Sequence, residues 1–143
     1  MSLLDKFKNT LIYESQKEFY DERGRGARYR MTTVGVSFFK EAVGDMKDTR
    51  GLVQWMKDNG FVEEAEMEED KVSVTLKVKG CCLKSITEGF TSRGKQPLSC
   101  PIANAVMYSL EQNGSMPPEI TPIEFEDGWC RIRMAKIYTS DIV

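Results

Sequence analysis

The chain has 143 residues, of which 41% are hydrophobic and 29% charged, a balance typical of one folded domain with its own core. Its formal net charge of −2 excludes a protein that binds nucleic acid through bulk positive charge. Because the chain has no histidine, Ser-His-Asp and Cys-His catalysis and metal sites with imidazole ligands are excluded as well.

Helical periodicity dominates the first 60 residues. Over 2–22, apolar side chains recur every three or four positions among Lys and Glu, and Ser2 is placed to cap a helix. A second helix is predicted from Met31 to Met46 on one apolar stripe, although the start of this segment also suits a strand. A third is predicted to begin at the capping residue Asp48 and to end at the Asn-Gly pair 59–60.

Four arginines surround two glycines between the first two of these helices. They are Arg23, Arg25, Arg28 and Arg30. Such a run of charge is typical of a solvated loop, and the alternative is a clamp for an anionic partner.

After residue 60 the apolar periodicity changes to two, which is the pattern of strands with one buried face. The strands Phe61–Met67 and Val72–Lys79 are predicted to form an antiparallel hairpin, with its turn at Glu68–Asp70. The segment Leu83–Leu98 contains two glycines and a proline, and it is predicted to be an irregular connection.

A further helix is predicted after Cys100, because Pro101 is favourable at the first helical position and an Asn-Gly pair follows Gln112. Residues 119–125 and 129–138 then predict a second hairpin across an Asp-Gly turn. The whole order predicts an α+β fold, in which N-terminal helices precede a four-stranded, mainly antiparallel sheet and one helix crosses between two hairpins.

The four cysteines carry most of the chemistry that the sequence allows. Cys81 and Cys82 end a strand, Cys100 precedes a helix, and Cys130 lies in the last long strand. If they converge, their thiolates could bind zinc or iron, with Glu88 as an additional ligand. No C-x-x-C pair is present, and adjacent cysteines in an extended chain point to opposite faces. The alternative is that they are small buried hydrophobic residues.

Cys100 also suits a catalytic role. A thiol at a helix N-terminus lies at the positive end of the helix dipole, which lowers its pKa. Cys100 could then act as a nucleophile, with a carboxylate or a lysine carrying the proton. A purely structural cysteine at the helix start is the alternative.

Several short motifs follow one another in a distinctive order. An acidic hairpin comes after Gly60-Phe61-Val62, and the strand 74–80 ends at Cys81. Cys100-Pro101-Ile102-Ala103-Asn104-Ala105 opens a helix, and Asp127-Gly128-Trp129-Cys130 precedes the last strand. This order resembles the 4-vinyl reductase domain family, which is related to the transport-particle subunits of the Golgi. The cysteine layout is also similar to that of aminothiazoline-carboxylate hydrolases.

The resemblance implies a ligand-binding domain over 41–143, behind an N-terminal helical extension over 1–40. It implies an apolar cavity between sheet and helices, dimerisation through helices, and a sensory role or an accessory role in tetrapyrrole metabolism. In some family members zinc is bound by cysteines near the cavity, and Cys81, Cys100 and Cys130 match those positions. The hydrolases imply a small thiol-dependent enzyme as an alternative.

The leading hypothesis is therefore binding of an apolar or aromatic small molecule under the helix that follows Cys100. The side chains expected to bind it are Phe38, Trp55, Phe90, Met107, Tyr108, Arg131 and Arg133. One alternative is a cysteine-dependent hydrolase or redox enzyme that uses Cys100. Another is an interaction module that pairs through the helix over 2–22.

The sequence predicts neither a membrane span nor a signal peptide, because no long apolar stretch is present. We therefore expect a cytoplasmic homodimer that binds neither nucleic acid nor membrane. In that compartment the cysteines are expected to be thiols, metal ligands or redox groups rather than structural disulfides. Zinc or iron on Cys81, Cys82, Cys100 and Cys130 is the cofactor expectation.

Overall fold

The structure is a computed structural model that describes residues 2–23, 33–97, 99–116, 123–135 and 137–138. The arginines at 25, 28 and 30 and the start of the predicted strand 119–125 lie outside these residues. The elements in chain order are α1 (Leu3–Arg23), α3 (Val36–Val43), α4 (Thr49–Asp58), β1 (Glu64–Glu69), β2 (Ser73–Lys79), α5 (Lys84–Thr91), α6 (Pro101–Gln112), β3 (Ser115–Met116), β4 (Glu124–Glu126), β5 (Trp129–Ala135) and β6 (Ile137–Tyr138).

A four-stranded antiparallel sheet in the order β1-β2-β5-β4 organises the fold. The two hairpins meet through β2 and β5, where Leu76 lies opposite Ile132. β3 and β6 form a separate short pair. The predicted α+β class, with α6 crossing between two hairpins, is confirmed.

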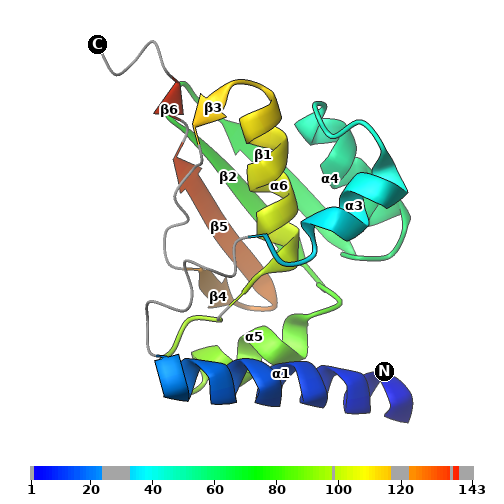
Figure 1. Ribbon diagram of the computed structural model, residues 1–143, viewed down its shortest axis with the longest axis vertical. Helices are drawn as coiled ribbons and strands as arrows, with labels where there is room; N and C mark the ends of the chain where they lie inside the picture. The colour runs from blue at the N-terminus through cyan, green and yellow to red at the C-terminus, as the bar shows by residue number, and fades with distance from the viewer. Residues whose placement is uncertain (1, 24–32, 98, 117–122, 136, 139–143) are drawn as a thin grey trace.

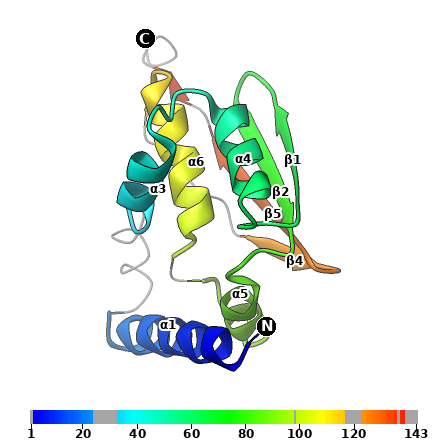
Figure 2. The same cartoon turned by 90° about the vertical axis from the view of Figure 1, so that its right-hand side faces the viewer.

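One face of the sheet carries the core. α6, α3 and α4 lie on that face, as Figure 2 shows, and no helix of the described residues covers the opposite face, which we call the open face. Along β5 the side chains alternate, so that Ile132 and Met134 are buried while Arg131 and Arg133 are exposed. This alternation is the expected consequence of one covered face.

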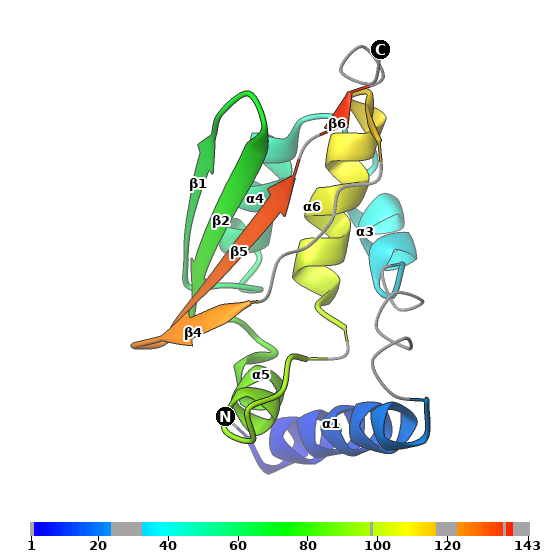
Figure 3. The same ribbon diagram turned by 90° about the vertical axis from the view of Figure 1, so that its left-hand side faces the viewer.

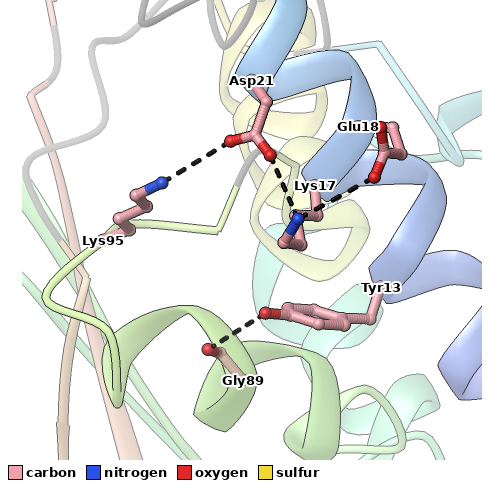
Figure 4. A network of polar contacts seen from close by, with 6 residues as sticks. All are labelled: Tyr13, Lys17, Glu18, Asp21, Gly89 and Lys95. Carbon is pink, nitrogen blue, oxygen red and sulfur yellow. Dashed lines mark hydrogen bonds and ion pairs between the residues drawn. The ribbon is translucent and has the colours of Figure 1, made fainter.

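α1 and α5 form a second region, at the end of the sheet where β2 ends and β5 begins (Figures 1 and 3). The Tyr13 ring of α1 packs edge-on against Phe90 of α5, with ring centroids 4.9 Å apart. The Tyr13 hydroxyl donates to the Gly89 carbonyl at 3.5 Å, and Lys95 pairs with Asp21 at 3.6 Å (Figure 4). In the part of the chain that the structure describes, α1 is therefore attached along one side.

The predicted helix boundaries at caps are confirmed. Asp48 caps α4 by accepting a hydrogen bond from the Gly51 N–H at 3.0 Å, and Asn59 is its C-cap. Ser2 accepts from the Asp5 N–H at 3.1 Å at the start of α1. None of the helices in the described ranges is long and apolar enough to cross a lipid bilayer.

The prediction of an irregular connection over Leu83–Leu98 was wrong, because α5 lies within it. Ile86 and Phe90, one helical turn apart, are both buried and hold this helix on the molecule. Gly89, one of the two glycines on which that prediction rests, lies inside the helix. A Cβ atom at Gly89 would lie only 2.8 Å from the Tyr13 ring, so the glycine permits the close approach of α1.

Two other boundaries differ from the predicted ones. The helix predicted from Met31 to Met46 is confined to α3, which begins after Gly35 and ends before Gly44, both at positive φ. The predicted division at residues 40 and 41 falls inside this helix. The first hairpin turns after Asp70, since the Asp70 carboxylate accepts hydrogen bonds from the N–H groups of Val72 and Ser73 at 2.8 and 2.7 Å.

Candidate functional site

A pocket of about 770 Å³ opens where α1 and α5 meet the end of β2. Its charged and thiol-bearing lining residues are Asp5, Glu63, Lys79, Cys81, Cys82, Lys84 and Glu88. We call it the cysteine pocket. Charges of both signs and two thiols therefore face one hollow.

The backbone turns sharply at the cysteines. Gly80 has φ +65, and a Cβ atom there would overlap the Glu63 side chain, so glycine is required at this exit from β2. The Cys82 N–H then donates to the Phe61 carbonyl at 2.9 Å, and the Lys84 N–H donates to the Cys81 carbonyl at 3.0 Å. The two cysteines consequently lie in a turn and not in an extended strand.

The two neighbouring thiols interact directly. A hydrogen bond from the Cys81 thiol lowers the pKa of Cys82 to about 7. The same bond, together with burial, raises the pKa of Cys81 far above its ordinary value. Cys82 is exposed and Cys81 is half-buried. Near neutral pH, Cys82 is thus the member of the pair that ionises, and Cys81 keeps its proton.

The other two cysteines lie nearby but are less accessible. Cys100 is the N-cap of α6, as predicted, and is half-buried. Cys130 is buried in β5, and burial, with the negative charges of Cys100 and Glu88, raises its pKa to about 11. The charge of Cys100 also raises the pKa of Cys81. All four cysteines therefore gather at one end of the sheet.

The gathering is too open for a metal centre of the expected kind. Within the described residues, no three Cys, Asp or Glu side chains lie close enough together to hold a metal ion. All four cysteines are free thiols. The side chains present do not fit a closed four-thiolate zinc or iron site, and that cofactor stays a prediction.

The seven side chains expected to bind an apolar ligand are spread over several regions. Phe38 and Trp55 belong to an aromatic cluster with Phe39 and Phe61, in which the Trp55 and Phe61 rings stack at 5.4 Å. Phe90 packs against α1. None of these side chains lines the cysteine pocket.

The remaining four lie elsewhere again. Met107 is buried in α6, and Tyr108 lies beneath the Lys40 ammonium, 5.0 Å from the ring centroid. Arg131 and Arg133 are exposed on the open face of the sheet, where Arg131 pairs with Glu124 at 3.5 Å. Arg131 lines a separate, polar hollow of about 420 Å³ on that face. A ligand-binding role of all seven stays a prediction.

Sequence reasoning found part of the cysteine pocket. Glu88, expected beside the cysteines, does line it, whereas Lys84 and Ser85 were missed together with α5. Asn9 of α1 was missed as well; its side-chain amide donates to Ser85 Oγ at 3.2 Å and to the Cys82 carbonyl at 3.4 Å. The helical spacing of Ile86 and Phe90 was the one signal that could have revealed α5, which forms this side of the pocket.

Comparisons with protein-family models, with curated proteins and with solved structures gave no match for this chain. The resemblance to the 4-vinyl reductase domain family stays a prediction.

Proposed function

We propose that the chain binds a small polar molecule in the cysteine pocket. The observation that carries this proposal is one hollow of about 770 Å³ in which thiols, ammonium groups and carboxylates converge. That volume lies in the range of small-molecule sites, where a few placed polar groups fix the ligand's orientation. The apolar ligand expected under α6 has less support, because eight residues of this helix are buried against its neighbours.

The charges of the lining favour a zwitterion. Lys79 and Lys84 suit a ligand carboxylate, and Glu63 and Glu88 suit an ammonium group. The exposed Cys82 thiol stands beside them and offers a contact to sulfur or to an electrophilic carbon. We therefore propose an amino-acid-like or small peptide-like ligand class.

Nuclear magnetic resonance of the full, isotope-labelled chain tests this proposal. The probes are single amino acids and dipeptides, cysteine and cysteinylglycine among them. We expect saturable shifts of the amide signals of Gly80, Gly128 and Lys84, which surround the pocket. Signals from the aromatic cluster report binding at an apolar site instead, and naphthalene is the probe for that site.

Two matched substitutions separate the pocket from general charge effects. Lys84→Gln should weaken binding of a carboxylate-bearing probe about tenfold, because a charge-assisted hydrogen bond is lost. Lys57→Gln, on the exposed side of α4, should leave it unchanged. The proposal is contradicted if no zwitterion shifts the pocket signals, or if only naphthalene binds and shifts the aromatic cluster.

A second function is favoured by the outer side of α1. Six large apolar side chains of this helix are exposed, and they are Leu3, Leu4, Phe7, Leu11, Ile12 and Phe19. Contiguous exposed apolar surface of this kind marks interaction sites. We propose that α1 pairs with α1 of a second copy.

Light scattering across a range of protein concentrations tests the pairing. Phe7→Glu should shift the wild-type dimer to monomer, because a buried carboxylate would lack a partner. Lys57→Glu, at an exposed position of α4 and outside this face, is the matched control and should leave the mass unchanged. A wild-type chain that remains monomeric at all concentrations would contradict the pairing.

A further inference from the structure

We propose that Cys81 and Cys82 form a reversible oxidation site for hydroperoxides, in which Cys82 reacts first and Cys81 resolves the product as a disulfide. The proposal does not depend on ligand binding, although it uses the same pocket. It rests on the solvent access of Cys82, on the neighbouring Cys81 thiol and on the charged groups around the two.

Access distinguishes Cys82 from the other cysteines. Its side chain is exposed and lines the pocket, so a small peroxide in solvent can reach its Sγ atom. Cys130 is only 6% exposed and lies in the sheet core. A redox-sensitive cysteine is typically accessible to solvent and next to a second thiol.

Pairing supplies the second thiol. Cys81 directly precedes Cys82 in the chain and lines the same pocket, so its thiol is the nearest one to any oxidised species formed on Cys82. The turn after Gly80 maintains this arrangement, because the Phe61 and Cys81 carbonyls accept backbone hydrogen bonds on either side. An oxidised Cys82 therefore has a neighbouring thiol that belongs to the same chain.

The surroundings of the pair carry charges of both signs. Lys79 and Lys84 line the same pocket, and ammonium groups stabilise a thiolate and the anion that leaves the peroxide. The pocket also contains Asp5, Glu63 and Glu88, whose charges act in the opposite direction. The neighbouring Cys81 thiol donates a hydrogen bond to Cys82 and lowers its pKa.

The chemistry proceeds in two balanced steps. The Cys82 thiolate attacks the terminal oxygen of a hydroperoxide; the S–O bond forms, the O–O bond breaks, and the departing alkoxide takes a proton to become an alcohol. The Cys81 sulfur then attacks the Cys82 sulfenic acid; the S–S bond forms and water leaves with the Cys81 proton. The thiols lose two electrons and the peroxide gains them. A thiol reductant reverses the change.

Peptide mass mapping of the full chain, treated with hydrogen peroxide in the absence of any ligand, tests the proposal. We expect a disulfide within the peptide that contains Cys81 and Cys82, and we expect dithiothreitol to restore both thiols. Cys130 should remain unmodified until the protein is denatured. A peroxide reaction that first modifies Cys100 or Cys130 would overturn the proposal.

Two variants identify the roles. Cys82→Ser should slow peroxide consumption at least about tenfold, because the ionised thiol is lost. Cys81→Ser should stop the reaction at a sulfenic acid on Cys82, trapped as its dimedone adduct. If Cys82→Ser does not fold, wild-type protein blocked at Cys82 with N-ethylmaleimide replaces it. Undiminished consumption in either form, or no dimedone adduct in Cys81→Ser, would contradict the assignment.

Discussion

The helices α1 and α6 show how differently two amphipathic segments are used in one small chain. α6 has 12 residues and buries eight of them against the neighbouring elements of the core. α1 has 21 residues, and its Leu3 and Phe7 side chains remain 85% and 58% exposed. α6 carries the packing energy of the domain, whereas α1 is attached by a few aromatic and polar contacts and presents apolar surface outward. The two helices therefore contribute differently to the stability of the domain.

Truncating one apolar side chain in each helix should give the largest difference in the free energy of unfolding. Ile102→Ala in α6 should lower the free energy of unfolding by about 2–5 kcal/mol, because it leaves a cavity between helix and sheet. Leu4→Ala in α1 should change it by less than about 0.5 kcal/mol when measured at concentrations that keep the chain monomeric. Urea unfolding followed by circular dichroism measures both. Equal losses would contradict the division between the helices.

Removing one hydroxyl group from each helix should give a smaller difference in the free energy of unfolding. Ser109 of α6 is fully buried and shares a hydrogen bond of 2.6 Å with Thr49 of α4. Ser109→Ala should cost about 1 kcal/mol, because it removes the shorter of two hydrogen bonds to the buried Thr49 hydroxyl, the other coming from Asn113. Thr10→Ala in α1 removes a hydrogen bond to the Lys6 carbonyl at an exposed position and should be close to neutral. Thermal unfolding of the two variants compares them directly.

Loss of a helix cap should likewise lower the free energy of unfolding more in α4 than in α1. Asp48→Ala removes the cap of α4, which packs in the core, and should cost about 1 kcal/mol. Ser2→Ala removes the cap of α1 and should cost less, because that exposed end frays before the domain unfolds. Amide hydrogen exchange distinguishes the two: protection should fall throughout α4 in the first variant and only in the first turn of α1 in the second.

The smallest effect on stability, and the clearest on reactivity, should come from Cys81→Ala. Alanine removes the thiol that donates to Cys82, so we expect the pKa of Cys82 to rise from about 7. Only the thiolate is alkylated, so the iodoacetamide rate at pH 7 should fall about three- to tenfold and its midpoint should move to higher pH. An unchanged midpoint would assign the lowered pKa to the pocket lysines.

Much of the fold could be predicted because local signals agreed with tertiary packing. The cap at Asp48, the proline that opens α6 and the Asp-Gly turn at 127–128 each determine the backbone within a few residues. The alternation along β2 and β5 identified the buried face of the sheet. These features depend on neighbours in the chain, and so the sequence alone revealed them.

The candidate site was less predictable, because it depends on contacts between distant residues. Gly89 interrupts the helical pattern locally, yet it is required by the Tyr13 ring, 76 residues earlier in the chain. Because α5 was not predicted from the sequence, the residues that it contributes to one wall of the pocket were missed. The direction of the Cys81 and Cys82 side chains depends on the turn at Gly80, which an extended-strand reading could not reproduce.

The edge strand β1 has a consequence for how copies of this chain meet. β1 lies at the end of the sheet, and four of its six residues are glutamates. An open strand edge is a template on which another chain can add and a fibre can grow, and charged side chains are one protection against this. At neutral pH two such edges repel each other. The sheet is thereby defended against aggregation along this edge.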